Sequence, residues 1–185
     1  PMRNLIKPLI ITGIASTWIA LFVLNEYIFK FTQISPAINL IFIPAGLRLI
    51  SVIIFSWVGV IGLFVGGVLI GIHFIELVPL QAITLAGLSA LSPFIAYSAI
   101  ARALKLEPSL ADMSARDLLI IAISAALLGG TLHSIFFLLN GSANTFIGPF
   151  IQIFTGDLLG MLLVLYCAKF GIWAYRQIYS SQYLK

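Results

Sequence analysis

Six ionisable residues lie within long apolar stretches of the sequence and are its first candidates for chemistry. They are Glu26, Arg48, His73, Glu76, His133 and Asp157. A charged side chain at the centre of a bilayer costs about 2.5–3.5 kcal/mol on insertion scales, so such residues usually mark a substrate, ion or proton site. These six are therefore the candidate ligand-binding residues of the chain.

Arg48 and Asp157 are expected to form an ion pair. Each lies about ten residues from the outer end of its apolar stretch, or roughly 15 Å at 1.5 Å per residue. That depth is near the midplane of a membrane, and the two residues carry opposite charges. Either the pair locks two helices together, or it also lines a ligand site; the sequence leaves both interpretations open.

The histidines and carboxylates raise the question of a metal or haem. Imidazole and carboxylate ligate several divalent ions, and His73 and His133 lie at one depth, as axial haem ligands would. Their spacing matches no ligand motif, however, and membrane histidines commonly hydrogen-bond to a neighbouring helix. We therefore predict no metal site and assign no cofactor. No nucleophile–base pair or phosphate-binding loop is present either, so we predict that the protein is not an enzyme.

The composition indicates that the stretches around these residues lie in a lipid membrane. The chain has 185 residues, of which 61% are hydrophobic and 9% charged, and its mean hydropathy is +1.13. Soluble domains carry roughly 25% charged residues. The apolar runs are long and continuous, without the alternation of a membrane barrel. The net charge of +4 comes from scattered basic residues in predicted loops, which suits anionic lipid and not nucleic acid.

The apolar runs predict an all-α membrane bundle with about six transmembrane helices, forming one domain over residues 1–185. The second helix is broken at Pro44–Gly46, either as a kink or as a short re-entrant entry followed by a short helix. A charged connector, Arg102–Asp117, precedes the fifth helix, and its part Ser109–Arg116 is a candidate interfacial turn. The predicted spans are Pro8–Phe29, Ala37–Phe55, Val60–Leu77, Leu80–Ala101, Leu118–Leu139 and Ile147–Tyr175.

The basic residues orient this bundle, because cytoplasmic loops carry an excess of Lys and Arg. With an even number of spans, nearly all basic loop residues fall on one side, and only Lys30 lies among the opposite loops. We predict a bacterial inner-membrane protein with both termini in the cytoplasm. The six candidate residues then lie between the outer surface and the midplane, which predicts a polar cavity that opens outward.

Pairs of glycines four residues apart allow another backbone to approach a helix closely. We expect them to serve packing inside the bundle, with a homodimer face as the alternative. The pairs are Gly62/Gly66, Gly67/Gly71 and Gly156/Gly160.

Two stretches resemble the first class of bacterial membrane-associated sensor domain. The first runs from Asn39 through Pro44-Ala45-Gly46 and on to the glycines after Trp57; the second is Thr155-Gly156-Asp157-Leu158-Leu159-Gly160. The resemblance implies that Pro44, Gly46, Gly156, Asp157 and Gly160 are family positions. Such domains usually precede a cytoplasmic signalling enzyme. Only a short tail follows the sixth predicted helix, so we expect a stand-alone copy.

A second resemblance is to the substrate-binding S components of energy-coupling-factor vitamin transporters. It rests on the length, the six helices and the stretch Ile43–Leu49, with a small-residue face on the first helix at Gly13, Ala15 and Ala20. This resemblance implies a vitamin-type small molecule as the ligand. Both resemblances imply an outward cavity.

Three functions follow from these observations. The first is a sensor-like or accessory membrane subunit that acts through a membrane protein partner or as a homo-oligomer. The second is the small-molecule-binding component of a transporter. The third is a structural subunit of a larger membrane complex. All three place the chain among membrane lipids, without nucleic acid.

Overall fold

The computed structural model describes residues 2–35, 38–106, 110 and 112–182, and within them confirms the predicted all-helical bundle. Six α-helices form in this part of the chain, together with one 3-10 turn and a two-stranded antiparallel hairpin. The elements in order are α1 (Met2–Ile28), η1 (Lys30–Thr32), β1 (Gln33–Ser35), β2 (Ile38–Asn39), α2 (Pro44–Phe55), α3 (Trp57–His73), α4 (Pro79–Leu104), α5 (Ala115–Leu139) and α6 (Ile147–Gln182).

Four of the described helices are long and apolar enough to cross a membrane, and α2 and α3 are shorter apolar helices. The long ones are α1, α4, α5 and α6. At 1.5 Å per residue, α2 is only about 18 Å long against a hydrocarbon core of about 30 Å. The six predicted spans are therefore four long helices and a pair of shorter ones.

The chain enters the bundle as an extended segment before α2 begins. Residues 38–43, here called the re-entrant segment, precede Pro44, which occupies the first turn of α2, where a missing N–H is not needed. The structure thus takes the second of the two predicted forms, a re-entrant entry and a short helix. The predicted helical span from Ala37 was too long, because hydropathy alone does not distinguish buried coil from helix.

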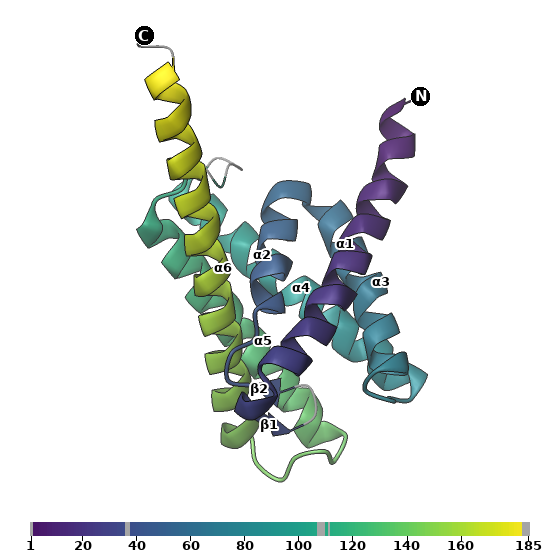
Figure 1. Cartoon of the computed structure of the whole chain (residues 1–185). Helices are drawn as coiled ribbons and strands as arrows, with labels where there is room; N and C mark the ends of the chain where they lie inside the picture. The colour runs from purple at the N-terminus through teal and green to yellow at the C-terminus, as the bar shows by residue number, and fades with distance from the viewer. Residues whose placement is uncertain (1, 36–37, 107–109, 111, 183–185) are drawn as a thin grey trace.

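The short helix α2 lies at the centre of the bundle. It contacts α1, α3, α4 and α6, and eight of its 12 residues are buried. Around it, α3 packs between α1 and α4, and α5 packs between α4 and α6 (Figure 1). A single residue, Ser56, with a φ of 50°, connects α2 to α3. The chain therefore reverses direction at once.

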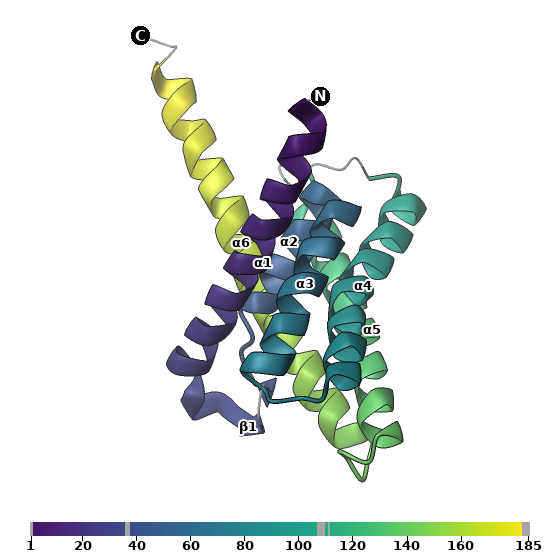
Figure 2. The ribbon, with the colours of Figure 1, turned by 90° about the vertical axis from the view of Figure 1, so that its right-hand side faces the viewer.

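Both termini lie at the same end of the bundle, as Figures 1 and 2 show. The connections α2–α3 and α4–α5 lie at this end, and the hairpin β1–β2 and the connections α3–α4 and α5–α6 lie at the other. The C-terminal part of α6 extends beyond the other helices (Figure 2). This arrangement matches the even number of passes expected from the basic residues.

The glycine pairs of α3 pack against helices of the same chain. A Cβ atom at Gly62 or Gly66 would meet α1 at Ile14 or Trp18, and one at Gly71 would lie 2.8 Å from the Cβ atom of Ala82 in α4. These glycines therefore let two helices approach α3 from opposite sides. The geometry uses them for packing inside the bundle, the first of the two predicted roles.

The boundaries of the charged connector differ from the prediction. Residues 107–109 and 111 lie outside the described part of the chain, so the predicted turn over Ser109–Arg116 is not assessed there. Helix α5 begins earlier than expected, at Ala115, because Ser114 and Asp117 form a capping box. The Ser114 Oγ atom accepts a hydrogen bond of 3.1 Å from the Asp117 N–H, and Asp117 accepts one of 3.0 Å from the Ser114 N–H.

Candidate ligand-binding site

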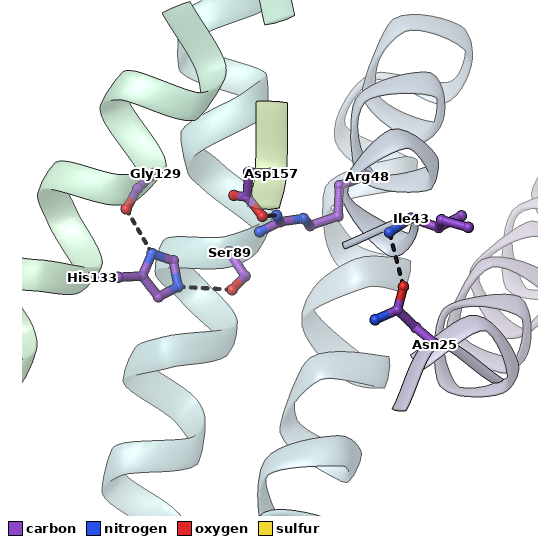
Figure 3. Close-up of polar contacts among 7 residues, drawn as sticks. All are labelled: Asn25, Ile43, Arg48, Ser89, Gly129, His133 and Asp157. Carbon is purple, nitrogen blue, oxygen red and sulfur yellow. Dashed lines mark hydrogen bonds and ion pairs between the residues drawn. The ribbon is translucent and has the colours of Figure 1, made fainter. Parts of the chain in front are cut away.

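The predicted ion pair is present at the centre of the bundle. The Arg48 Nη2 atom, on the second turn of α2, lies 2.5 Å from Oδ1 of Asp157 on α6 (Figure 3). Both side chains are almost fully buried, at 6% and 8% exposure. Arg48 reaches this depth because α2 starts inside the bundle and not at its end. The charge of each residue is thereby neutralised within the apolar interior.

Two aromatic rings surround the arginine. The Arg48 Cζ atom lies 5.6 Å from the ring centroids of both Trp18 and Phe42. The two rings meet edge to face, with centroids 6.0 Å apart. A guanidinium at this distance from an aromatic face is stabilised by the ring quadrupole, and more so where water is excluded. The rings therefore stabilise the guanidinium in addition to its ion pair with Asp157.

The re-entrant segment is fastened to both neighbouring helices. The Asn25 Oδ1 atom of α1 accepts a hydrogen bond of 3.0 Å from the Ile43 N–H (Figure 3). On the other side, the Phe42 N–H donates to the Gly156 carbonyl of α6 at 3.1 Å. Irregular backbone at membrane depth is tolerated only where protein satisfies its polar groups, and these two bonds do so.

Two glycines of α6 make room for this segment. A Cβ atom at Gly156 would collide with the Asn39 carbonyl oxygen, and one at Gly160 with the Phe42 carbonyl oxygen. The pair therefore receives an irregular backbone and not another helix. Gly46 plays the matching part on α2, where an added Cβ would collide with the side chain of Val164.

His133 joins α4 to α5 beside the ion pair. Its Nδ1 atom lies 2.8 Å from the Gly129 carbonyl oxygen and its Nε2 atom 3.0 Å from the Ser89 Oγ atom (Figure 3). A carbonyl only accepts, so Nδ1 carries the hydrogen, and Nε2 is free to accept from the serine hydroxyl. Both nitrogens of a neutral ring are thus satisfied.

A cavity of about 490 Å³ adjoins these groups, and Arg48, Asp157 and His133 are among its lining residues. Every helix of the described chain contributes to the wall, together with Asn39 and Phe42 of the re-entrant segment. The lining is mainly apolar, and its size is within the range of small-molecule sites. It extends to the α3–α4 and α5–α6 connections, at the end of the bundle opposite the termini.

Most of the chain matches one family of known protein domains. A family model for MASE1 matches residues 13–183. The chain belongs to the MASE1 family. It is thus a membrane-integral domain of the sensor type, as the first resemblance predicted. Searches of curated proteins and of solved structures returned no match, and the resemblance to transporter S components has no support from them.

The five residues that the MASE1 resemblance implies as family positions lie in one region of this domain. Asp157 holds Arg48 of α2, Gly156 and Gly160 receive the re-entrant segment, and Pro44 and Gly46 form the start of α2 beside α6. They therefore lie on both sides of one junction. The re-entrant segment and α2 form one side of it, and α6 forms the other. In this MASE1 domain the motif residues shape a single contact.

The six predicted site residues do not all come together. Arg48, Asp157 and His133 line the cavity, and Glu26 lies beside it, accepting a hydrogen bond of 2.5 Å from the Asn39 Nδ2 atom. His73 and Glu76 are exposed at the end of α3 and in the connection that follows, outside the lining. The prediction grouped them by depth, which does not determine the direction in which a side chain points.

Some lining residues were missed by the sequence analysis. Trp18, Asn39 and Ser89 are not ionisable, so the cost of a charge in lipid did not single them out. Asn25, which lies outside the lining but fastens the re-entrant segment, was missed as well, and its position next to Glu26 was an available signal. In the part of the chain that the structure describes, no three His, Cys, Asp or Glu residues gather as a metal site would require.

Proposed function

We propose that this MASE1 domain is a sensor in which a small molecule, bound in an outward-facing cavity, changes the position of α6 and so acts on a partner protein. The observation that carries the proposal is the ion pair: Asp157 of α6 lies at the inner end of the cavity and holds Arg48. A ligand that alters this contact acts directly on the helix that leaves the bundle.

The orientation follows from charge. The end of the bundle that holds the termini carries Lys7, Arg102, Lys105, Arg116 and Arg176, whereas the cavity end has Lys30. The positive-inside rule then assigns the cavity to the extracytoplasmic side of a bacterial inner membrane, with both termini in the cytoplasm. A cavity on that side is accessible to molecules from outside the cell.

Helix α6 is suited to carry the change across the membrane. Its 36 residues span about 54 Å, well beyond the hydrocarbon thickness of about 30 Å. Near the opposite end, the Lys169 Nζ atom donates to the Met113 carbonyl at 2.5 Å, and the Tyr166 hydroxyl donates to the Ala115 carbonyl at 3.3 Å. One rigid element thus contacts the cavity and the α4–α5 connection, where a cytoplasmic partner would bind.

The test measures whether the ion pair sets the position of α6. Cys167 is the sole cysteine of the chain and is exposed on α6, so it can be spin-labelled together with a second label at Ala103→Cys on α4. We expect Asp157→Asn to change the distance between the labels by about 1–2 Å, the scale of helix shifts in switching proteins. Glu76→Gln, an exposed acid at the cavity end, is the matched control.

An unchanged distance distribution in Asp157→Asn, with the fold intact, would contradict the sensor mechanism. The ion pair would then be a structural lock, and the chain would be better described as a structural subunit.

A further inference from the structure

The charged and titratable residues of the cavity lining are paired with one another or with neighbouring protein groups. Arg48 and Asp157 lie 2.5 Å apart, and their side chains are only 6% and 8% exposed (Figure 3). The buried His133 ring has a partner within 3.0 Å for each of its nitrogens, the Gly129 carbonyl and the Ser89 hydroxyl. Within the described lining, the inner end of the cavity therefore offers a ligand no unpaired charge.

Most of the surface that the lining presents to the cavity is apolar. Six of its larger apolar side chains are half-buried, and they come from the re-entrant segment, the α3–α4 connection and three helices. They are Phe42, Ile75, Leu77, Leu85, Phe137 and Ile153. The polar residues Ser142 and Gln152 also keep accessible surface, but they lie toward the outer end, in the α5–α6 connection and the second turn of α6. The cavity thus combines a polar mouth with an apolar interior.

The charge of the wall disfavours an ionised ligand. The two formal charges of the described lining, on Arg48 and Asp157, sum to zero. An ion would lose its hydration on entering without gaining a free counter-charge, or it would have to separate the existing pair, and both are costly. An apolar molecule that leaves water for the same wall gains free energy by burial. The volume of about 490 Å³ is sufficient for a small molecule of this kind.

We infer that the cavity binds an uncharged, predominantly apolar molecule, which is held by burial against the apolar wall and forms no ion pair with Arg48. This inference rests on the proposed ligand-binding function and narrows the ligand to one chemical class. Ile153 and Gly156 place α6 in the wall, so such a molecule acts on α6 by its volume. Two sources supply this chemistry, namely the acyl chain of a membrane lipid and a separate apolar molecule.

The test uses the tryptophans of the chain as reporters. Of its three tryptophans, Trp18 lines the cavity, whereas Trp57 and Trp173 are exposed outside the lining. Trp57→Phe/Trp173→Phe therefore leaves Trp18 as the reporter of the cavity, and Trp18→Phe/Trp173→Phe leaves Trp57 as the matched control. Each purified full chain is titrated in micelles with 4-bromobiphenyl, its 4′-carboxylate and its cationic 4′-aminomethyl derivative. Bromine quenches tryptophan fluorescence on contact, and each probe is compared at equal concentration in the micelle.

We expect saturable quenching of Trp18 by 4-bromobiphenyl, with a midpoint at least tenfold lower than that of either charged probe, and quenching of Trp57 without saturation. Ala143→Phe adds a ring to the lining at the α5–α6 connection and should raise the midpoint about tenfold. Ala103→Phe, exposed on α4 outside the lining, should leave it unchanged.

A phosphatidylcholine with brominated acyl chains then distinguishes the two sources. Saturable quenching of Trp18 by this lipid assigns the cavity to an acyl chain. Quenching by 4-bromobiphenyl alone assigns it to a separate apolar molecule. Both results support an uncharged apolar ligand.

A lower midpoint for either charged probe would overturn the inference, because the site would then select a charge. Quenching of Trp18 by 4-bromobiphenyl without saturation, as at Trp57, would overturn it as well. If Ala143→Phe does not fold, the comparison of the three probes decides, because it uses no cavity variant. Movement of α6 is measured separately by the spin labels. If Asp157→Asn shifts α6 while a charged probe binds best, the sensor mechanism stands and only the ligand class is wrong.

Discussion

The same glycine spacing serves two different purposes in α3 and in α6. In α3 the two glycine pairs face regular helices, α1 and α4, and the atom nearest to each added Cβ would be a side-chain carbon. In α6 they face the carbonyl oxygens of the re-entrant segment, which belong to backbone. A whole helix can shift slightly away from an added methyl group, whereas a backbone segment fixed by hydrogen bonds on both sides has less freedom to move. The α6 junction should therefore tolerate substitution less well than the α3 junctions.

The largest effect is expected from breaking the ion pair at the α6 junction. Asp157→Leu leaves Arg48 charged and unpaired in the interior, and we expect the free energy of unfolding to fall by about 3–5 kcal/mol. The measurement is SDS-induced unfolding in mixed micelles. The double variant Arg48→Leu/Asp157→Leu should recover much of the loss, because it buries no charge. If the double variant is as unstable as the single one, the charge itself is not the cause.

Next in size is Gly160→Ala, which tests the comparison directly. The added methyl group collides with the Phe42 carbonyl, so we expect a loss near the upper end of the overpacking range, about 3 kcal/mol. Gly171→Ala is the control in the same helix, since no atom lies within 4 Å of a Cβ there. It should be neutral or stabilising by up to about 1 kcal/mol, as expected for alanine in a helix.

A smaller loss is expected at the α3 junction. Gly71→Ala places its methyl group 2.8 Å from the Cβ atom of Ala82, and the two helices can separate slightly to relieve the contact. We expect about 1–2 kcal/mol by thermal unfolding, below the value for Gly160→Ala. The reverse order would show that the re-entrant segment adapts more easily than a packed helix pair, and the comparison would fail.

The smallest effect should come from Asn25→Leu, which removes the hydrogen bond between α1 and the Ile43 N–H. Loss of a buried acceptor costs about 1–3 kcal/mol, but the Asn25 Nδ2 atom is itself without a partner, so its removal offsets part of this. We therefore expect about 1 kcal/mol in the same unfolding assay. Faster hydrogen exchange at Ile43, with little change in α3, would localise the effect to the re-entrant segment.

The sequence predicts this fold well where one property decides the outcome. Continuous apolar runs predict the long helices, and Pro44 predicts where α2 begins. Depth and charge together predict the pair of Arg48 with Asp157, because two lone charges in lipid have few other solutions.

The rest depends on information that a membrane helix does not encode in its hydropathy. Both the buried and the lipid-facing sides are apolar, so there is no periodicity to set the rotation of a helix. That is why His73 and Glu76 were expected in the cavity and lie on the surface. The role of Asn25 in fastening the re-entrant segment could not be predicted from the sequence either, because its partner is the backbone N–H of Ile43, 18 residues away.

The re-entrant segment also constrains how this chain is made. Its polar backbone groups are satisfied on one side by α1, which a ribosome delivers first, and on the other by Gly156 in α6, which it delivers last. Until α6 has entered the bilayer, the Phe42 N–H lacks its acceptor and Arg48 its counter-charge. We therefore expect the centre of the domain to assemble only after the final helix has been inserted, so that a nascent chain halted before residue 156 remains unassembled around α2.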